Sequence, residues 1–128
     1  HKMEKVILII EDDRMIQRLL SRMIKRSGFT GKTEIFDNSE EVFTFIMQSG
    51  DQIVLALMDT SIHPDGDAAL AQELLKLCPE INLVASSGHS EEDLRGPQHF
   101  GGIDLAAVLS KPFGMQDVKD LLASLNLI

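Results

Sequence analysis

The stretch Val6-Ile7-Leu8-Ile9-Ile10-Glu11-Asp12-Asp13 sets five apolar residues directly before three carboxylates. A short run this rich in β-branched residues is typical of a strand buried on both faces of a parallel sheet. The three acids then stand where the strand leaves one edge of the sheet. Two readings of them are open: a solvated turn whose acids favour the start of a helix, or a site for a hard divalent cation with oxygen ligands.

Strand-type and helix-type patterns alternate along the rest of the chain. Short apolar runs predict further strands at residues 32–36, 53–58, 81–85 and 105–109. Apolar residues at helical spacing follow each strand, beginning with Met15 to Ile24 and ending with Val118 to Leu125. The ends of the intervening helices are indicated by Asn38 with Glu41, by Ser90 with Asp93, and by Pro79.

Five strands alternating with five helices favour a doubly wound α/β fold, because right-handed crossovers onto a parallel sheet are the default for this order. We predict a flavodoxin-like (βα)5 three-layer sandwich with the strand order 2-1-3-4-5. At 128 residues, the chain is expected to form one domain over residues 1–128. His1-Lys2 is interpreted as a cloning remnant.

Composition excludes several classes of function. The chain has 20 acidic and 12 basic residues, a formal net charge of −8, so direct nucleic-acid binding by this domain is not expected. The single cysteine, Cys78, cannot form an internal disulfide, which fits a reducing cytoplasm. Apolar runs near 20 residues and signal-peptide patterns are absent from the sequence, so membrane insertion is not expected either.

Polar groups follow four of the predicted strands. In open α/β sheets the ligand site lies beyond the carboxyl ends of the strands, where the strand order reverses. Asp59 is the candidate nucleophile there, because a carboxylate can accept a phosphoryl group when a cation neutralises the approaching phosphate. Ser87 and Lys111 would bind phosphoryl oxygens as a hydroxyl donor and a point charge. Singly, each has an ordinary reading as a turn or surface residue; together they predict one site.

These residues, in this order, resemble the receiver domain of two-component response regulators, and the resemblance covers essentially the whole chain. It rests on the acids after the first strand and on Leu57-Met58-Asp59, Ser87-Gly88 and Lys111-Pro112-Phe113. The resemblance implies that Asp59 takes a phosphoryl group from the phosphohistidine of a histidine kinase or from a histidine phosphotransfer protein.

The resemblance also implies the surrounding roles. Lys111, preceding a cis bond to Pro112, and Ser87 would contact the phosphoryl group. The protein would be a cytoplasmic signalling switch rather than an enzyme, promoting only its own phosphorylation and dephosphorylation. It would act on a downstream protein or output domain through the face of the fourth helix, fifth strand and fifth helix. The cofactor Mg²⁺ would be held by Asp12, Glu11, Asp59 and the backbone carbonyl of Ser61.

Three departures from the family pattern keep an alternative open. Pro64 lies five rather than four residues after Asp59, and Asp65-Gly66 comes one residue early. Val108 stands where the family has an aromatic switch residue. The segment 95–104 lacks the usual Gly-Ala-Asp approach to the fifth strand. The alternative is a degenerate receiver that binds proteins without being phosphorylated.

Histidines occupy the unusual segments. His63 is interpreted as a loop residue rather than a metal ligand, because no second soft ligand is near it in the sequence. The segment 95–104 is expected to be a surface loop with Phe100 buried, and partner contact by His99 and Phe100 is the competing interpretation. His89, next to the switch serine, is a candidate for influencing the lifetime of the phosphoryl group.

Two enzymatic alternatives are disfavoured. A phosphatase of the haloacid-dehalogenase type needs a second Asp two residues after its nucleophile, and position 61 is Ser. Dinucleotide binding needs a Gly-rich turn after the first strand, where this chain has acids that would repel a pyrophosphate. The sequence leaves open whether the domain stands alone or belongs to a hybrid sensor kinase or larger regulator.

Overall fold

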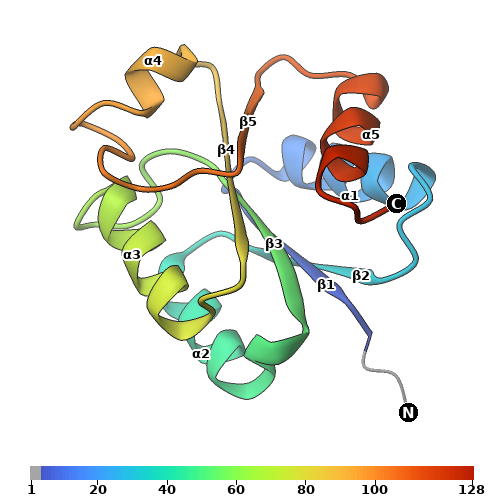
Figure 1. Cartoon of the computed structure of the whole chain (residues 1–128), viewed down its shortest axis with the longest axis horizontal. Helices are drawn as coiled ribbons and strands as arrows, with labels where there is room; N and C mark the ends of the chain where they lie inside the picture. The colour runs from blue at the N-terminus through green and yellow to red at the C-terminus, as the bar shows by residue number, and fades with distance from the viewer. Residues whose placement is uncertain (1–3) are drawn as a thin grey trace.

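A computed structural model describes residues 4–128, so the interpretation of His1-Lys2 lies outside the described residues. Strands and helices alternate as predicted (Figure 1). Within residues 4–128, no helix is both long enough and apolar enough to cross a membrane. In chain order the elements are β1 (Val6–Ile10), α1 (Arg14–Arg26), β2 (Lys32–Phe36), α2 (Ser39–Ser49), a 3-10 turn η1 (Gly50–Gln52), β3 (Ile53–Met58), α3 (Asp67–Leu77), β4 (Asn82–Ser87), α4 (Glu91–Leu94), β5 (Ala107–Ser110) and α5 (Met115–Ser124).

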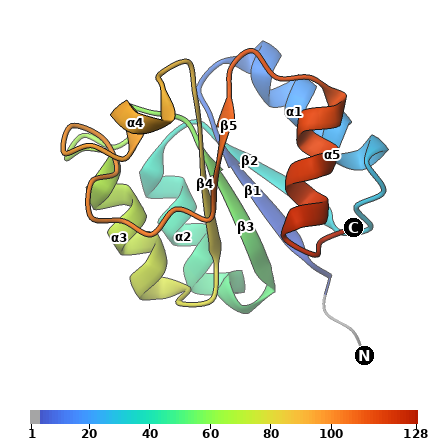
Figure 2. The ribbon, with the colours of Figure 1, turned by 45° about the horizontal axis from the view of Figure 1, so that its top comes forward.

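The five strands form one parallel sheet in the order β2-β1-β3-β4-β5, which confirms the predicted doubly wound topology. Helices α1 and α5 cover one face of this sheet, while α2, α3 and α4 lie on the other side (Figure 2). The order reverses between β1 and β3, which are hydrogen-bonded neighbours at the centre. The carboxyl ends of these two strands therefore meet at the switch point where ligands of this fold class bind.

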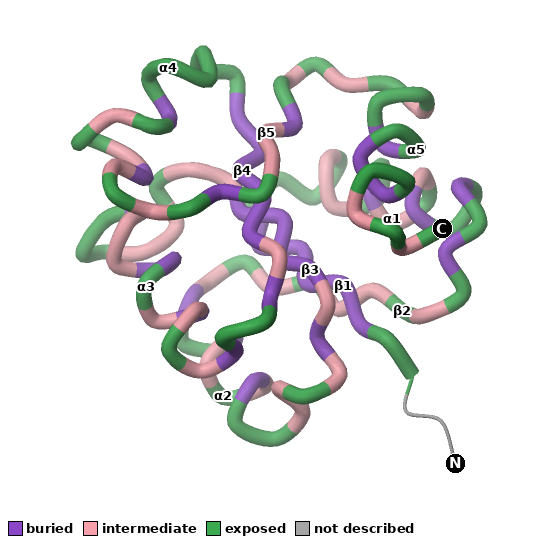
Figure 3. The backbone as a smooth tube through the Cα atoms, viewed as in Figure 1, coloured by how far each residue is buried: buried purple, intermediate pink, exposed green. Residues whose placement is uncertain are grey.

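The core consists of two apolar layers separated by the sheet. The central strands β1, β3 and β4 are buried along almost their whole length (Figure 3). Val6, Leu8 and Ile10 belong to the layer under α2 and α3, while Ile7 and Ile9 belong to the layer under α1 and α5. All five side chains are fully buried. Successive side chains of a strand point to opposite faces, so only a continuously apolar strand can serve both layers.

Polar side chains start the helices at the positions that the sequence indicates. The Asp13 carboxylate accepts the N–H groups of Met15 and Ile16, at 2.8 and 3.2 Å, and so caps α1. Asn38 caps α2 and Ser90 caps α4 in the same way. Each cap satisfies backbone donors that have no partner within the helix.

Two strand boundaries differ from the prediction. β4 spans 82–87 rather than 81–85, and β5 spans 107–110 rather than 105–109. The cause is pairing between the strands: Ser86 and Ser87 pair in register with the last two residues of β5 and so extend β4 past its apolar run. Phe100 is 1% exposed, which confirms that the segment before β5 buries its aromatic residue.

Cys78 ends α3 as a core residue. Its side chain is 7% exposed and its Sγ contacts the carbonyl oxygen of Gly50 at 3.5 Å. Burial, helped by the negative charge of Asp51, raises the pKa of the thiol above its usual value. Both effects disfavour the thiolate, which is the reactive form.

We therefore expect Cys78 to react with a disulfide reagent such as DTNB at pH 8 much more slowly in the folded protein than in urea. The measurement is the rate of thionitrobenzoate release in each condition. Because Cys78 is the only cysteine, the signal reports this site alone. Equal rates in the two conditions would contradict the burial of the thiol.

Candidate functional site

Backbone hydrogen bonds carry the ladder of the sheet one residue past the strands. Glu11 donates its N–H to the last residue of β2, Asp59 to the last residue of β1, and Lys111 to the last residue of β4, each at 2.9 Å. These three residues are far apart in the sequence, but the ladder fixes their backbones at one edge of the sheet. The structure thus brings together groups that the sequence analysis assigned to one site.

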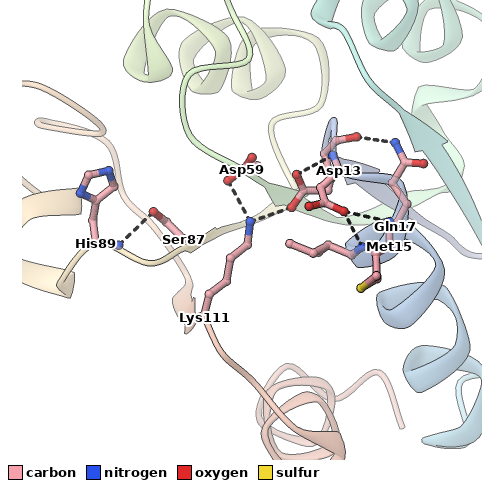
Figure 4. A network of polar contacts seen from close by, with 9 residues as sticks. Asp13, Met15, Gln17, Asp59, Ser87, His89 and Lys111 are labelled. Atoms are coloured by element: carbon pink, nitrogen blue, oxygen red, sulfur yellow. Dashed lines mark hydrogen bonds and ion pairs between the residues drawn. The ribbon is translucent and has the colours of Figure 1, made fainter.

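Lys111 bridges two of the acids (Figure 4). Its Nζ donates to Glu11 Oε1 at 2.7 Å and to Asp59 Oδ1 at 3.2 Å. The Glu11 side chain is only 3% exposed and that of Asp59 16%, so both pairs are shielded from solvent. The predicted cis bond between Lys111 and Pro112 is present. Lys111 supplies the positive charge that the two carboxylates need when no cation is bound.

The protonation of Lys111 follows from this environment. Burial by itself lowers the pKa of the ammonium group, but the hydrogen bond to Glu11 and the negative charge of Asp59 outweigh it. The pKa of Lys111 is therefore raised above its usual value of 10.5. The stabilisation from the ion pairs is fully present at pH values below the usual lysine pKa of 10.5. It is lost only as the pH rises through the higher pKa that Lys111 has in the folded protein.

The acids themselves form a cluster that could hold a cation. Carboxylate oxygens of Glu11, Asp12 and Asp59 lie within 4.8 Å of one another, and this is the only such group of possible metal ligands among residues 4–128. Three carboxylates against one lysine leave net negative charge, and a hard cation with oxygen ligands suits that set. Asp13 is outside it, because its carboxylate caps α1. The helix-start reading of the triplet thus applies to Asp13, while Glu11 and Asp12 stay candidates for the cation site.

Ser87 lies at the end of β4 and is 2% exposed. Its Oγ accepts the backbone N–H of His89 at 3.1 Å, and Figure 4 shows the hydroxyl turned toward His89 rather than toward Lys111. As an acceptor in this contact, the hydroxyl keeps its own hydrogen for donation. The neighbouring Ser86 is buried as well, and its Oγ has no hydrogen-bond partner among residues 4–128.

The loop after Asp59 has an unusual backbone. Ser61 has φ = +65°, a conformation that residues other than glycine rarely adopt, and its N–H donates to Asp67 Oδ1 at 2.7 Å. His63 accepts the N–H of Asp65 at 2.9 Å and its ring lies 6.0 Å from that of Phe43. His63 is thus a loop residue outside the acidic set, in line with its interpretation.

Asp67 and its partner His99 were missed as a pair by the sequence analysis. The Asp67 side chain is 3% exposed, and its Oδ2 lies 2.7 Å from Nδ1 of His99. An acid at the first position of a helix looks like an ordinary favourable charge near the helix dipole. Its partner is 32 residues away, and no local pattern links the two.

Comparisons with known proteins agree with this geometry. Residues 7–123 match the sequence profile of the family described as "Response regulator receiver domain". The fold is similar to a response regulator from Thermotoga maritima, with a TM-score of 0.80, 15% identity, and coverage of 96% of this chain and 98% of that one. It is also similar to a response regulator receiver domain protein from Methanospirillum hungatei JF-1, with a TM-score of 0.76, 22% identity, and coverage of 97% and 95%.

One curated relative is a D-aminoacyl-tRNA deacylase from Thermococcus onnurineus (strain NA1), 24% identical over 122 residues. The match covers 88% of this chain but only 43% of the relative. The chain thus spans less than half the length of that protein.

Replacing Lys111 tests the bridge. In EDTA at pH 7, we expect Lys111→Met to lower the free energy of unfolding by about 1.5–3 kcal/mol, because Glu11 loses a charged hydrogen-bond partner where water cannot replace it. Added Mg²⁺ should recover part of this loss by neutralising the same acids. Urea unfolding with and without Mg²⁺ measures both effects.

Lys119→Met is the matched control. Lys119 is exposed on α5, so this substitution removes the same charge at a position away from the acids. Its effect should be small and independent of Mg²⁺. Equal losses in the two variants would show that the bridge does not stabilise the fold.

Proposed function

Because the chain belongs to the response regulator receiver domain family, we propose that Asp59 accepts a phosphoryl group from the phosphohistidine of a histidine kinase or histidine phosphotransfer protein. The observation that carries the proposal is the placement of Lys111 between Glu11 and Asp59, beside the three clustered carboxylates. Receiver domains are signalling switches rather than enzymes in the usual sense. Phosphorylation would change the affinity of this domain for a downstream partner.

The transfer is an in-line displacement at phosphorus. An oxygen of the Asp59 carboxylate forms the new O–P bond, and the P–N bond breaks with its electron pair leaving on the imidazole nitrogen. Lys111, already 3.2 Å from Asp59 Oδ1, is placed to pair with an oxygen of the arriving phosphoryl group. Hydrolysis reverses the modification: water attacks phosphorus, the carboxylate leaves, and inorganic phosphate is released.

The donor set of the site fits Mg²⁺, which receiver domains typically bind. Asp12, Glu11 and Asp59 would hold the ion through carboxylates, and Ser61 through its backbone carbonyl. When bound, the ion neutralises charge on the phosphoryl oxygens and on the acids. Before an ion binds, the positive charge of Lys111 offsets the repulsion between the carboxylates of Glu11 and Asp59.

Ser87 supports a switch mechanism. Its hydroxyl hydrogen is available, and a phosphoryl group on Asp59 would offer a charged acceptor stronger than any neutral one. Donation to that acceptor would draw Ser87 away from the His89 N–H. The segment after β4 would then change its conformation. This change would shift the conformational equilibrium of the face formed by α4, β5 and α5, where a downstream protein or output domain would bind.

A degenerate receiver that binds partners without phosphorylation is the second candidate. Val108 favours it: this residue of β5 is half-buried and packs against the core under α2 and α3. A small side chain held there cannot swing between two positions as an aromatic switch residue would. The intact set of Glu11, Asp12, Asp59 and Lys111 opposes this candidate.

We propose further that residues 1–128 act as one cytoplasmic receiver unit without direct nucleic-acid binding. The family profile covers residues 7–123, which leaves only short ends outside it. The formal net charge of −8 supports a protein partner over a nucleic acid.

Incubation with acetyl phosphate and Mg²⁺ tests the proposed function. We expect the intact protein to gain the mass of one phosphoryl group, and EDTA to suppress the gain. Asp59→Asn should abolish it, because an amide oxygen is too weak a nucleophile. Mass spectrometry of the intact protein gives the readout.

Asp104→Asn is the matched control, because Asp104 is an exposed acid outside the carboxylate set and should leave the gain unchanged. An unchanged mass in the wild-type protein would reject phosphoryl transfer and favour the degenerate receiver. A gain that persists in Asp59→Asn would place the modification on another residue.

A further inference from the structure

Asp67 is a buried acidic residue at the first position of α3, and the proposed chemistry does not use it. It is 4% exposed. One oxygen accepts the N–H of Ser61 at 2.7 Å, and the other lies 2.7 Å from Nδ1 of His99. Asp67 thus joins the loop that carries Asp59 to the segment between α4 and β5.

The hydrogen bond between Ser61 and Asp67 stabilises a strained backbone conformation of the loop at Ser61. Ser61 is exposed, so packing does not hold it, and its φ of +65° costs energy for a residue with a side chain. The short hydrogen bond that the Ser61 N–H donates to the buried Asp67 carboxylate offsets that cost. The direction of the Ser61 carbonyl follows from the same backbone conformation, and it is this carbonyl that the proposed cation site uses.

The contact with His99 fixes Asp67 in turn. A carboxylate removed from water needs both oxygens satisfied, and His99 supplies the second partner. The His99 ring lies against the ring of His89, with centroids 4.6 Å apart, and the N–H of His89 is the donor to Ser87. Figure 4 shows the last of these contacts, between the His89 N–H and the Ser87 hydroxyl at the end of β4.

We propose that Asp67, held by His99, is a positioning residue for cation and phosphoryl binding at the acidic site. It acts through Ser61, whose backbone it holds at positive φ, the conformation from which the carbonyl would contact the cation. This inference rests on the proposed function, since it assigns residues that support the same site. A role limited to starting α3 would stabilise the fold but leave the affinity for Mg²⁺ unchanged.

The first test measures Mg²⁺ affinity of the unphosphorylated protein from amide chemical shifts in an NMR titration. We expect Asp67→Ala to weaken binding about 10-fold, the scale typical of losing an outer partner of a metal ligand. Asp67→Asn should stay close to wild type, because its amide still accepts from Ser61 and can donate to His99. Asp65→Ala is the control: it removes an exposed charge from the same loop.

Variants of His99 test the second contact. His99→Phe keeps a ring against His89 but removes the partner of Asp67, so it should weaken Mg²⁺ binding in the same direction as Asp67→Ala. His99→Asn keeps an N–H donor near the position of Nδ1 and should restore the affinity. These variants also keep the proposal testable if Asp67→Ala fails to fold, which urea unfolding would reveal.

A double-mutant cycle isolates the action through Ser61. Glycine adopts positive φ without strain, so Ser61→Gly should make the hydrogen bond from the residue 61 N–H to Asp67 less necessary. Asp67→Ala should then cost much less Mg²⁺ affinity in the Ser61→Gly background than in wild type. Equal costs in the two backgrounds would overturn the proposed route.

The outcomes separate this inference from the proposed function. If the wild-type protein neither binds Mg²⁺ nor gains a phosphoryl group, the proposed function fails and the inference with it. If the wild type does both and Asp67→Ala binds Mg²⁺ as tightly, only the inference fails. A loss of unfolding free energy in Asp67→Ala with unchanged Mg²⁺ affinity would assign Asp67 a structural role alone.

Discussion

The parallel register of the sheet is the constraint on which the site depends. Strands that run the same way end at the same edge, and backbone hydrogen bonds continue the ladder to Glu11, Asp59 and Lys111. Residues 52 and 100 positions apart therefore meet in one hydrogen-bonded group. The fold thus forces carboxylates together against their repulsion, and Lys111 offsets that repulsion in the absence of a cation. The chemistry of the site is a direct consequence of strand alignment.

Much of this arrangement was predictable from the sequence, for reasons that particular residues make clear. Val6 to Ile10 had to be buried on both faces, and the position of Asp59 after a second such strand made a shared edge the natural expectation. Ser86 and Ser87 were misjudged as residues beyond β4, because pairing with β5 rather than local apolar character sets the end of that strand. Strand propensity is a property of the local sequence, whereas hydrogen-bonded pairing in a sheet depends on a strand elsewhere in the chain.

The Asp67–His99 pair marks the limit of such reasoning. Each residue has an unremarkable local setting, and the 2.7 Å contact exists only because α3 and the segment before β5 pack on the same side of the sheet. The contacts from Ser61 to Ser87 link the loop after β3 to the end of β4, and Val108 takes no part in them. These contacts depend on the buried carboxylate of Asp67, whose two partners are Ser61 and His99.

The separation of the two apolar layers from the reactive edge has a consequence for how such a protein diversifies. The side chains of β1 that stabilise the fold are fully buried and contribute nothing to the chemistry, while the loop at 60–66 and the segment at 95–104 lie outside the sheet. Substitutions at the exposed positions of these two regions would leave the core unchanged, whereas Ile62 and Phe100, which pack in the core, tie each region to the folding free energy. Exposed and buried positions of the same loop are then free to evolve at different rates.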